Sequence, residues 1–112
     1  SFSRKRGNYM VLYRGQWRFW IENNGRRIVE LESPPESETG SAQSKAITKA
    51  ADMPDLLKHM FRTVLRQQGL SRIKIERWNG EDIAESDMAA ELRALGAERD
   101  NRALVLWASD IN

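Results

Sequence analysis

Apolar and polar residues alternate near the start of the chain in a way that predicts a three-stranded antiparallel meander. Residues 9–13 are apolar or aromatic, and residues 17–21 alternate between large apolar and polar or exposed types. Asn24-Gly25 follows, a dipeptide that tolerates the positive φ angles of a type I′ turn. The third strand is then expected at residues 28–31.

The segment at residues 32–51 has a different composition, rich in Ser, Pro, Glu, Thr, Gly and Gln, with Pro34-Pro35 near its start. It offers few apolar side chains to bury, so it is predicted to be a mobile loop. Residues 45–51 are compatible with a helix, and this end of the loop is expected to be partly ordered.

A helix is predicted after this loop, because Asp52 suits an N-cap position and Pro54 suits a first turn. The apolar residues then follow helical spacing, and Gly69 is expected to end the helix. These apolar positions are Met53, Leu56, Leu57, Met60, Phe61, Val64 and Leu65.

The last third of the chain predicts short strands around one further helix. Residues 73–78 alternate as a half-buried strand does, and Asn79-Gly80 favours a tight turn into a short returning strand at residues 81–84. A second helix is expected to begin at Ser86 or Asp87.

Gly96 is expected to end this second helix. A hairpin then closes the chain, with strands at residues 97–99 and 103–107 joined through Asp100-Asn101. Strands followed by helices that cover one face indicate an α+β fold, built from an antiparallel meander and hairpins packed with two helices.

Length and composition indicate one small domain. The chain has 112 residues, of which 40% are hydrophobic, and no cysteine, so packing and hydrogen bonds rather than disulfides must hold it together. The absence of cysteine fits a reducing, cytoplasmic setting. The longest apolar runs are far shorter than the roughly 20 residues of a spanning helix, so no membrane partner is expected.

Basic residues are concentrated near the amino terminus, although the formal net charge is only +2. Glu22 is the one acidic residue among the first 27. The basic residues of this segment are Arg4, Lys5, Arg6, Arg14, Arg18, Arg26 and Arg27. The opening Ser-Phe-Ser-Arg-Lys-Arg, without a methionine, suggests a piece of a longer protein.

Three segments together resemble the C-terminal end of large helicase-related (Lhr) proteins. They are RIKIERWNGEDIAES at residues 72–86, the helix end Ala-Leu-Gly-Ala at residues 94–97 and the strand Arg-Ala-Leu-Val-Leu-Trp at residues 102–107. The first hairpin and Asn-Gly-Arg-Arg at residues 24–27 also match the family. The resemblance covers nearly the whole chain except residues 32–51. The last strand departs from the family pattern, since it continues to residue 112 instead of ending in basic residues.

This resemblance implies an ATP-dependent 3′–5′ DNA helicase of superfamily 2 that acts in DNA repair, with this chain as its C-terminal accessory domain. The implied partners are single-stranded DNA or a DNA/RNA hybrid and the upstream helicase domains of the same chain. No Gly-x-x-x-x-Gly-Lys-Ser/Thr phosphate loop is found in the sequence. No cofactor is therefore expected in this fragment, and ATP and Mg²⁺ belong to the motor of the parent protein.

The aromatic and basic residues suggest nucleic-acid binding or self-assembly. Aromatic rings stack on unpaired bases and arginines hold phosphates, but the same rings can equally fill a core or a contact between copies. Trp17 and Trp78 favour the core more than Trp20 does, because strand alternation places Trp20 opposite Phe19. The predicted nucleic-acid-binding residues are Arg14, Arg18, Trp20, Arg26, Arg27 and Trp107.

An alternative interpretation is a DNA glycosylase site for uracil or a damaged base. Such chemistry needs a carboxylate beside the sugar of a flipped base. Asp110 lies three residues after Trp107, where an acid and an aromatic wall could share a pocket. Asp110 is therefore the candidate catalytic residue, and no metal site is expected. A solvated carboxylate is the simpler interpretation of Asp110.

Overall fold

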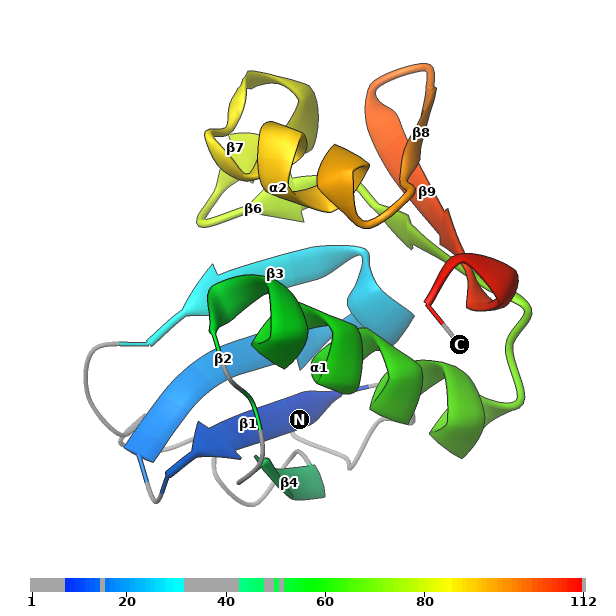
Figure 1. Cartoon of the computed structure of the whole chain (residues 1–112). Helices are drawn as coiled ribbons and strands as arrows, with labels where there is room; N and C mark the ends of the chain where they lie inside the picture. Colours follow the sequence, from blue (N-terminus) through cyan, green and yellow to red (C-terminus); the bar gives the residue numbers. More distant parts are fainter. Residues whose placement is uncertain (1–7, 15, 32–42, 48–49, 51, 112) are drawn as a thin grey trace.

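A computed structural model describes residues 8–14, 16–31, 43–47, 50 and 52–111. Six of its strands form one sheet in the order β4-β1-β2-β3-β6-β7 (Figure 1). Their bounds are β1 Tyr9–Tyr13, β2 Gln16–Glu22, β3 Arg27–Glu30, β4 Gln43–Ile47, β6 Arg77–Trp78 and β7 Glu81–Asp82. Strands β1, β2 and β3 form the predicted antiparallel meander.

The remaining strands form a three-stranded sheet in the order β5-β9-β8. Their bounds are β5 Arg72–Ile75, β8 Glu98–Asp100 and β9 Ala103–Trp107. The helices are α1 Met53–Gln68 and α2 Met88–Ala94, with single 3₁₀ turns η1 Asn23–Gly25, η3 Ile83–Glu85 and η4 Ala108–Asp110. The predicted α+β class is confirmed. Two parallel pairs, β1 with β4 and β3 with β6, were not predicted.

Strand β4 corrects the prediction of a loop throughout residues 32–51. Residues 32–42 lie outside the described residues, whereas residues 43–47 pair in parallel with β1. Parallel pairing is made by backbone groups, so a polar sequence such as Gln-Ser-Lys-Ala-Ile can join a sheet edge without an apolar pattern. The expectation of partial order at this end was right, but the order is a strand rather than a helix.

Two of the predicted turns differ from the sequence interpretation. Glu22 pairs with Arg27, so four residues connect β2 to β3 in place of a two-residue type I′ turn. The β8–β9 hairpin is shifted by one residue, because Asp100 pairs with Ala103 across Asn101 and Arg102. The turn at Asn79-Gly80 is confirmed, with positive φ angles of 52° and 82°.

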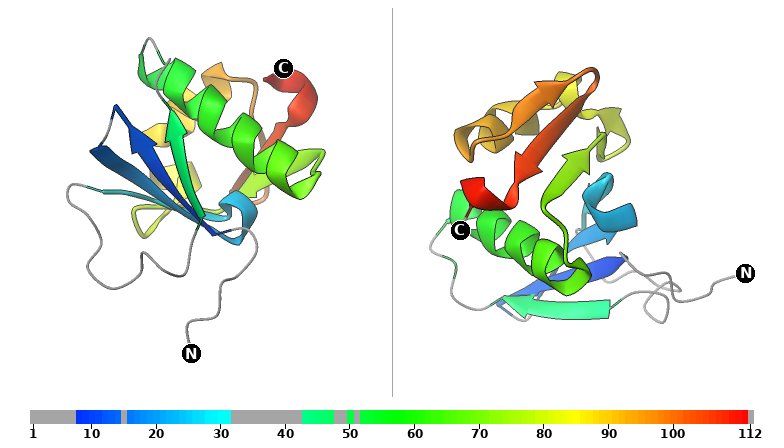
Figure 2. Two further views of the ribbon diagram at one scale, coloured as in Figure 1. Left: turned by 90° about the horizontal axis from the view of Figure 1, so that it is seen from below. Right: turned by 90° about the vertical axis from the view of Figure 1, so that its right-hand side faces the viewer.

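The hydrophobic core lies where α1, the inner face of the six-stranded sheet and the three-stranded sheet meet (Figures 1 and 2). The apolar stripe of α1 supplies the helical part of this core. The largest fully buried side chains are Trp78, Tyr9, Phe19, Phe61, Met10, Ile21, Ile28, Leu56, Leu57, Met60, Ile73 and Ile75.

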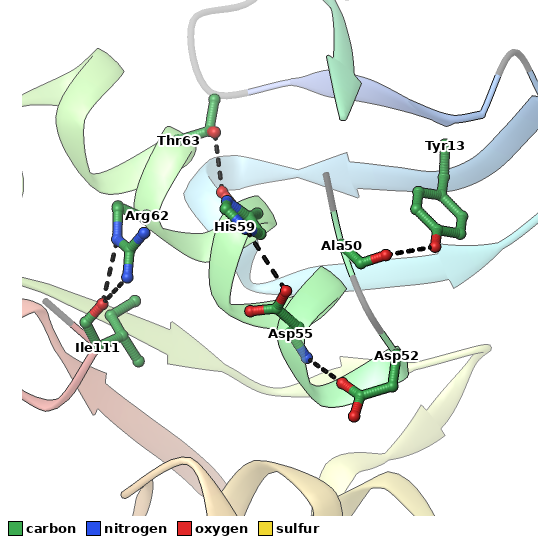
Figure 3. Close-up of polar contacts among 8 residues, drawn as sticks. All are labelled: Tyr13, Ala50, Asp52, Asp55, His59, Arg62, Thr63 and Ile111. Carbon is green, nitrogen blue, oxygen red and sulfur yellow. Dashed lines mark hydrogen bonds and ion pairs between the residues drawn. The ribbon is translucent and has the colours of Figure 1, made fainter. Parts of the chain in front are cut away.

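Helix α1 has the predicted ends. Asp52 accepts a hydrogen bond from the backbone N–H of Asp55 at 3.0 Å, and Gly69 ends the helix in the left-handed conformation with φ 63°. Mid-helix, the guanidinium of Arg62 donates to the carbonyl oxygen of Ile111 (Figure 3). Ile111 is 1% exposed, so this contact fixes the last described residue of the chain against α1.

Trp78 belongs to the core, the position that the sequence favours for it. It is 2% exposed and packs edge-on against Phe19, with ring centroids 5.9 Å apart. Its indole N–H donates to Glu30 Oε2 at 3.1 Å, and Asn79 Oδ1 accepts from the backbone N–H of Glu30 at 2.7 Å. These contacts hold β6 against β3, although the two strands are far apart in the sequence. The side chain of Trp17 lies outside the described residues.

Candidate nucleic-acid interface

The described residues form an open, charged groove of about 630 Å³. It lies between the tip of the β8–β9 hairpin and the segment from β5 to β7. Four cationic and three acidic side chains contribute to its lining. The lining residues are Lys74, Glu76, Arg77, Asp82, Arg99, Asp100, Asn101, Arg102 and Ala103.

Ion pairs within the groove neutralise some of these charges and leave others available. Arg77 lies 3.4 Å from Asp82, and Lys74 lies 3.9 Å from Asp100. Arg99 and Arg102 have no carboxylate partner among the described residues. Both are exposed on the β8–β9 hairpin, so this wall of the groove presents two unneutralised guanidinium groups.

The tip of that wall is ordered by a local contact. Arg99 Nε donates to the carbonyl oxygen of Asn101 at 2.9 Å, and Asn101 itself has φ 57°. Asparagine adopts this left-handed conformation more readily than most residues, which explains its place in a tight turn. The contact holds the guanidinium of Arg99 beside the hairpin turn that also carries Arg102.

Arg26 and Arg27, two of the predicted binding residues, border this groove. The carbonyl oxygen of Arg26 accepts from the backbone N–H groups of Glu76 and Arg77 at 2.9 and 3.0 Å. The Arg26 side chain lies 3.8 Å from Glu76. Arg27 is the register partner of Arg77 in the parallel pair of β3 and β6. Arg26 and Arg27 therefore lie next to the groove without being among the residues that line it.

Trp20 lies between Phe19 and Ile21 in β2. These two residues pack in the core with α1, so the side chain of Trp20 lies on the opposite face of the six-stranded sheet. Its indole N–H donates to Glu22 Oε1 at 2.7 Å, and Arg27 Nη1 donates to Glu22 Oε2 at 3.2 Å. Glu22 thus connects Trp20 to Arg27. Trp20 is half-buried, and its hydrogen bond fixes the orientation of the ring.

Arg14 and Arg18 are not part of this groove. Arg14 lies in the β1–β2 turn, at the end of the meander opposite to Arg26, and its guanidinium lies 5.1 Å from the ring centroid of Tyr13. The Nε atom of Arg18 is buried without a hydrogen-bond partner in the described part of the chain. The predicted arginines are therefore divided between two regions. Arg4, Lys5 and Arg6 lie outside the described residues.

Trp107 is the only exposed large hydrophobic side chain among the described residues, with 40% of its surface accessible. It is the register partner of Arg72 in the pair of β5 and β9. The guanidinium carbon of Arg72 lies 5.5 Å from the centroid of the Trp107 ring. This distance is that of a cation–π contact.

Asp110 has a local structural contact and is exposed. Its Oδ2 atom accepts from the backbone N–H of Trp107 at 3.1 Å, which satisfies a donor at the start of η4. A shallow depression beside it is lined by Asp52, Pro54, Asp55, Lys58, Ala94, Leu95 and Asp110. Trp107 is not among the described residues that line this depression, so the ring and the acid do not share it.

The catalytic role of Asp110 stays a prediction, and two substitutions separate it from the structural role. Asp110→Ala is expected to lower the free energy of unfolding by at most about 1 kcal/mol, since it removes one exposed hydrogen bond. Asp110→Asn keeps the shape and a carbonyl acceptor. Uracil excision by the parent protein that is unchanged in Asp110→Asn would contradict catalysis by this carboxylate, whereas loss of excision in a folded variant would support it.

Four groove residues were missed in the sequence, namely Lys74, Arg77, Arg99 and Arg102. Strand alternation at residues 72–76 already places Arg72 and Lys74 on the exposed face. No local pattern, however, brings this face to the β8–β9 hairpin or to Arg26. Among the described residues, no group of three or more His, Cys, Asp or Glu side chains could hold a metal ion.

Neither helix in the described part of the chain is long and apolar enough to cross a membrane. Comparison of the chain with protein-family models, curated proteins and solved structures gives no match.

Proposed function

We propose that this chain is a non-motor accessory domain that binds the phosphate backbone of nucleic acid through the groove between β5–β7 and the β8–β9 hairpin. The observation that carries the proposal is the pair of unneutralised arginines, Arg99 and Arg102, on one wall of an open groove. Arginine is suited to this role because its planar guanidinium can donate two hydrogen bonds to one phosphate. Arg26 and Arg27 lie beside the groove, each paired with an acid, Glu76 and Glu22 respectively.

The groove is suited to contacts with the nucleic-acid backbone rather than to recognition of particular bases. Its lining is made almost entirely of charged and polar groups, which suit phosphate oxygens. Contacts of this kind fix position and add affinity, but they do not discriminate between bases. The three acids of the groove limit the affinity, so the domain is expected to assist a larger binding surface.

The resemblance to Lhr proteins supports a specific setting for this activity. In that setting the chain is the C-terminal domain of an ATP-dependent DNA helicase that acts in DNA repair, and ATP and Mg²⁺ serve the upstream motor. The strand delivered by the motor would be single-stranded DNA or one strand of a DNA/RNA hybrid. The domain contributes a binding surface to that strand and does not itself hydrolyse ATP.

Salt dependence of oligonucleotide binding tests this proposal. The chain is expected to bind a labelled single-stranded oligonucleotide in an anisotropy titration, with affinity that falls steeply as salt rises. Replacing Arg99 and Arg102 together with glutamine should weaken binding. The slope of log K against log salt should become shallower by about 1.4, because each lost phosphate contact to a single strand contributes about 0.7.

The matched control removes the same charge elsewhere. Arg66 and Arg93 are exposed residues in the last turns of α1 and α2, away from the groove. Their double glutamine variant should keep the wild-type slope. Equal losses in the two double variants would contradict a role for the groove. No binding at low salt would refute nucleic-acid binding by this chain and leave self-assembly, which light scattering would detect.

A further inference from the structure

We infer that Trp107 and Arg72 form a stacking platform for one unpaired nucleobase of the strand whose phosphates lie in the groove. This inference rests on the proposed function and adds a second binding element to it. The groove accounts for the phosphates, but the described residues that line it include no aromatic side chain on which a base could stack. Trp107 supplies such a side chain, and the sheet places it on the face that carries Lys74 and Asp100 of the groove.

The position of Trp107 relative to the groove follows from the register of β5 and β9. Arg72 pairs with Trp107, and Lys74 pairs with Val105. Alternate residues of a strand share a face, so these four side chains lie on one face of the sheet. The opposite face, formed by Ile73, Ile75, Leu104 and Leu106, packs into the core, whereas on the Trp107 face only Val105 is buried among these four. Lys74, which lines the groove, therefore lies next to the pair of Arg72 and Trp107 along the same face of the sheet.

The spacing fits successive nucleotides of one strand. Two residues along a strand span about 6.6 Å. A nucleic-acid strand at duplex spacing advances about 3.4 Å per nucleotide, and an unstacked strand advances further. A phosphate at the Lys74 end of the groove, where Lys74 itself is paired with Asp100 at 3.9 Å, therefore places a base one or two nucleotides away at Trp107.

The platform is held at a fixed position by the backbone on both sides of Trp107. The N–H of Trp107 donates to Asp110 Oδ2 at 3.1 Å, and the N–H of Ala108 donates to the carbonyl oxygen of Ser71 at 2.9 Å. Because the backbone at Trp107 is already ordered, less conformational entropy is lost when a base stacks on the ring. Asp110 accordingly acts here as a positioning residue.

Arg72 makes this exposed ring different from a solitary surface tryptophan, which by itself would need no explanation. Its guanidinium lies over the Trp107 ring, and Arg72 has no carboxylate partner among the described residues. It can therefore contact the phosphate of the stacked nucleotide. Aromatic rings beside arginines are the usual elements of sequence-tolerant single-strand binding. A base paired within a duplex is not available for stacking, so the platform favours unpaired strands.

The experiment compares two ligands of equal length, a single-stranded oligonucleotide and an abasic oligonucleotide that keeps the phosphates but lacks the bases. Trp107→Ala is expected to weaken binding of the first by roughly 5- to 150-fold, the range for loss of one base–aromatic stack. It should leave binding of the abasic strand unchanged. Trp107→Phe keeps an aromatic face and should lose less affinity than Trp107→Ala.

The outcomes separate this inference from the proposed function. If Trp107→Ala binds the base-bearing strand like the wild type while salt dependence persists, the platform is refuted and the groove remains. If the wild type shows no salt-dependent binding, the proposed function fails and the platform fails with it. Equal losses for both ligands would also refute stacking. Should Trp107→Ala unfold, Trp107→Phe decides, because equal weakening for both strands would again refute stacking.

Discussion

Replacing Gly25 with alanine is expected to lower the free energy of unfolding by roughly 2 to 5 kcal/mol, through positive-φ strain and overpacking. Gly25 has φ 102°, which side chains of L-residues rarely adopt. A Cβ atom at this position would lie 2.5 Å from Cγ2 of Ile73, a core residue that is 1% exposed. The turn between β2 and β3 therefore packs directly on β5. Chemical denaturation of the variant measures the loss.

Gly80→Ala is the matched control for this effect. Gly80 also has a positive φ, 82°, but a Cβ atom there would meet nothing within 4 Å. It should therefore show the cost of strain without the cost of the clash. Ile73→Ala removes the clashing methyl group, and in that background Gly25→Ala should cost about as much as Gly80→Ala. Equal losses for Gly25→Ala and Gly80→Ala in the wild-type background would refute the packing explanation.

Trp78→Ala is expected to cost about 3 to 5 kcal/mol, the usual range for truncating a large buried aromatic residue. The substitution removes the edge-on contact with Phe19 and leaves Glu30 without its indole donor. It also loosens the pairing of β6 with β3, which holds Arg77 beside Arg27 at the groove. Thermal unfolding followed by circular dichroism gives the loss of stability.

Trp107→Ala serves as the counterpart of Trp78→Ala. Trp107 is 40% exposed, so its removal should cost no more than about 1 kcal/mol, chiefly the contact with Arg72. The two tryptophans are thus expected to have opposite phenotypes, one affecting stability and the other affecting oligonucleotide binding. A destabilisation by Trp107→Ala as large as that by Trp78→Ala would contradict the assignment of Trp107 to the surface.

The candidate site was only partly predictable from sequence. Arg26, Arg27 and Trp107 were identified because basic and aromatic residues are recognisable wherever they occur. Arg99 and Arg102 were not, because each is an ordinary charge in a short hairpin until the hairpin is placed opposite Arg77. Asp110 is the opposite case, a residue for which the sequence suggested an arrangement that the described residues do not form. Its closeness to Trp107 in sequence suggested a shared pocket, but the 3₁₀ turn that follows β9 directs its carboxylate to a backbone N–H.

Local sequence patterns were sufficient to predict the elements whose formation depends on residues adjacent in the chain. The apolar segments at residues 9–13 and 28–31 and the alternation at residues 17–21 predict the meander. The cap at Asp52 with helical apolar spacing predicts α1, because period and capping are properties of consecutive residues. The pairing of β4 with β1, the pairing of β3 with β6 and the groove join segments that lie far apart along the chain. These features depend on backbone pairing and on the packing of the core around Ile73 and Trp78, which no local pattern encodes.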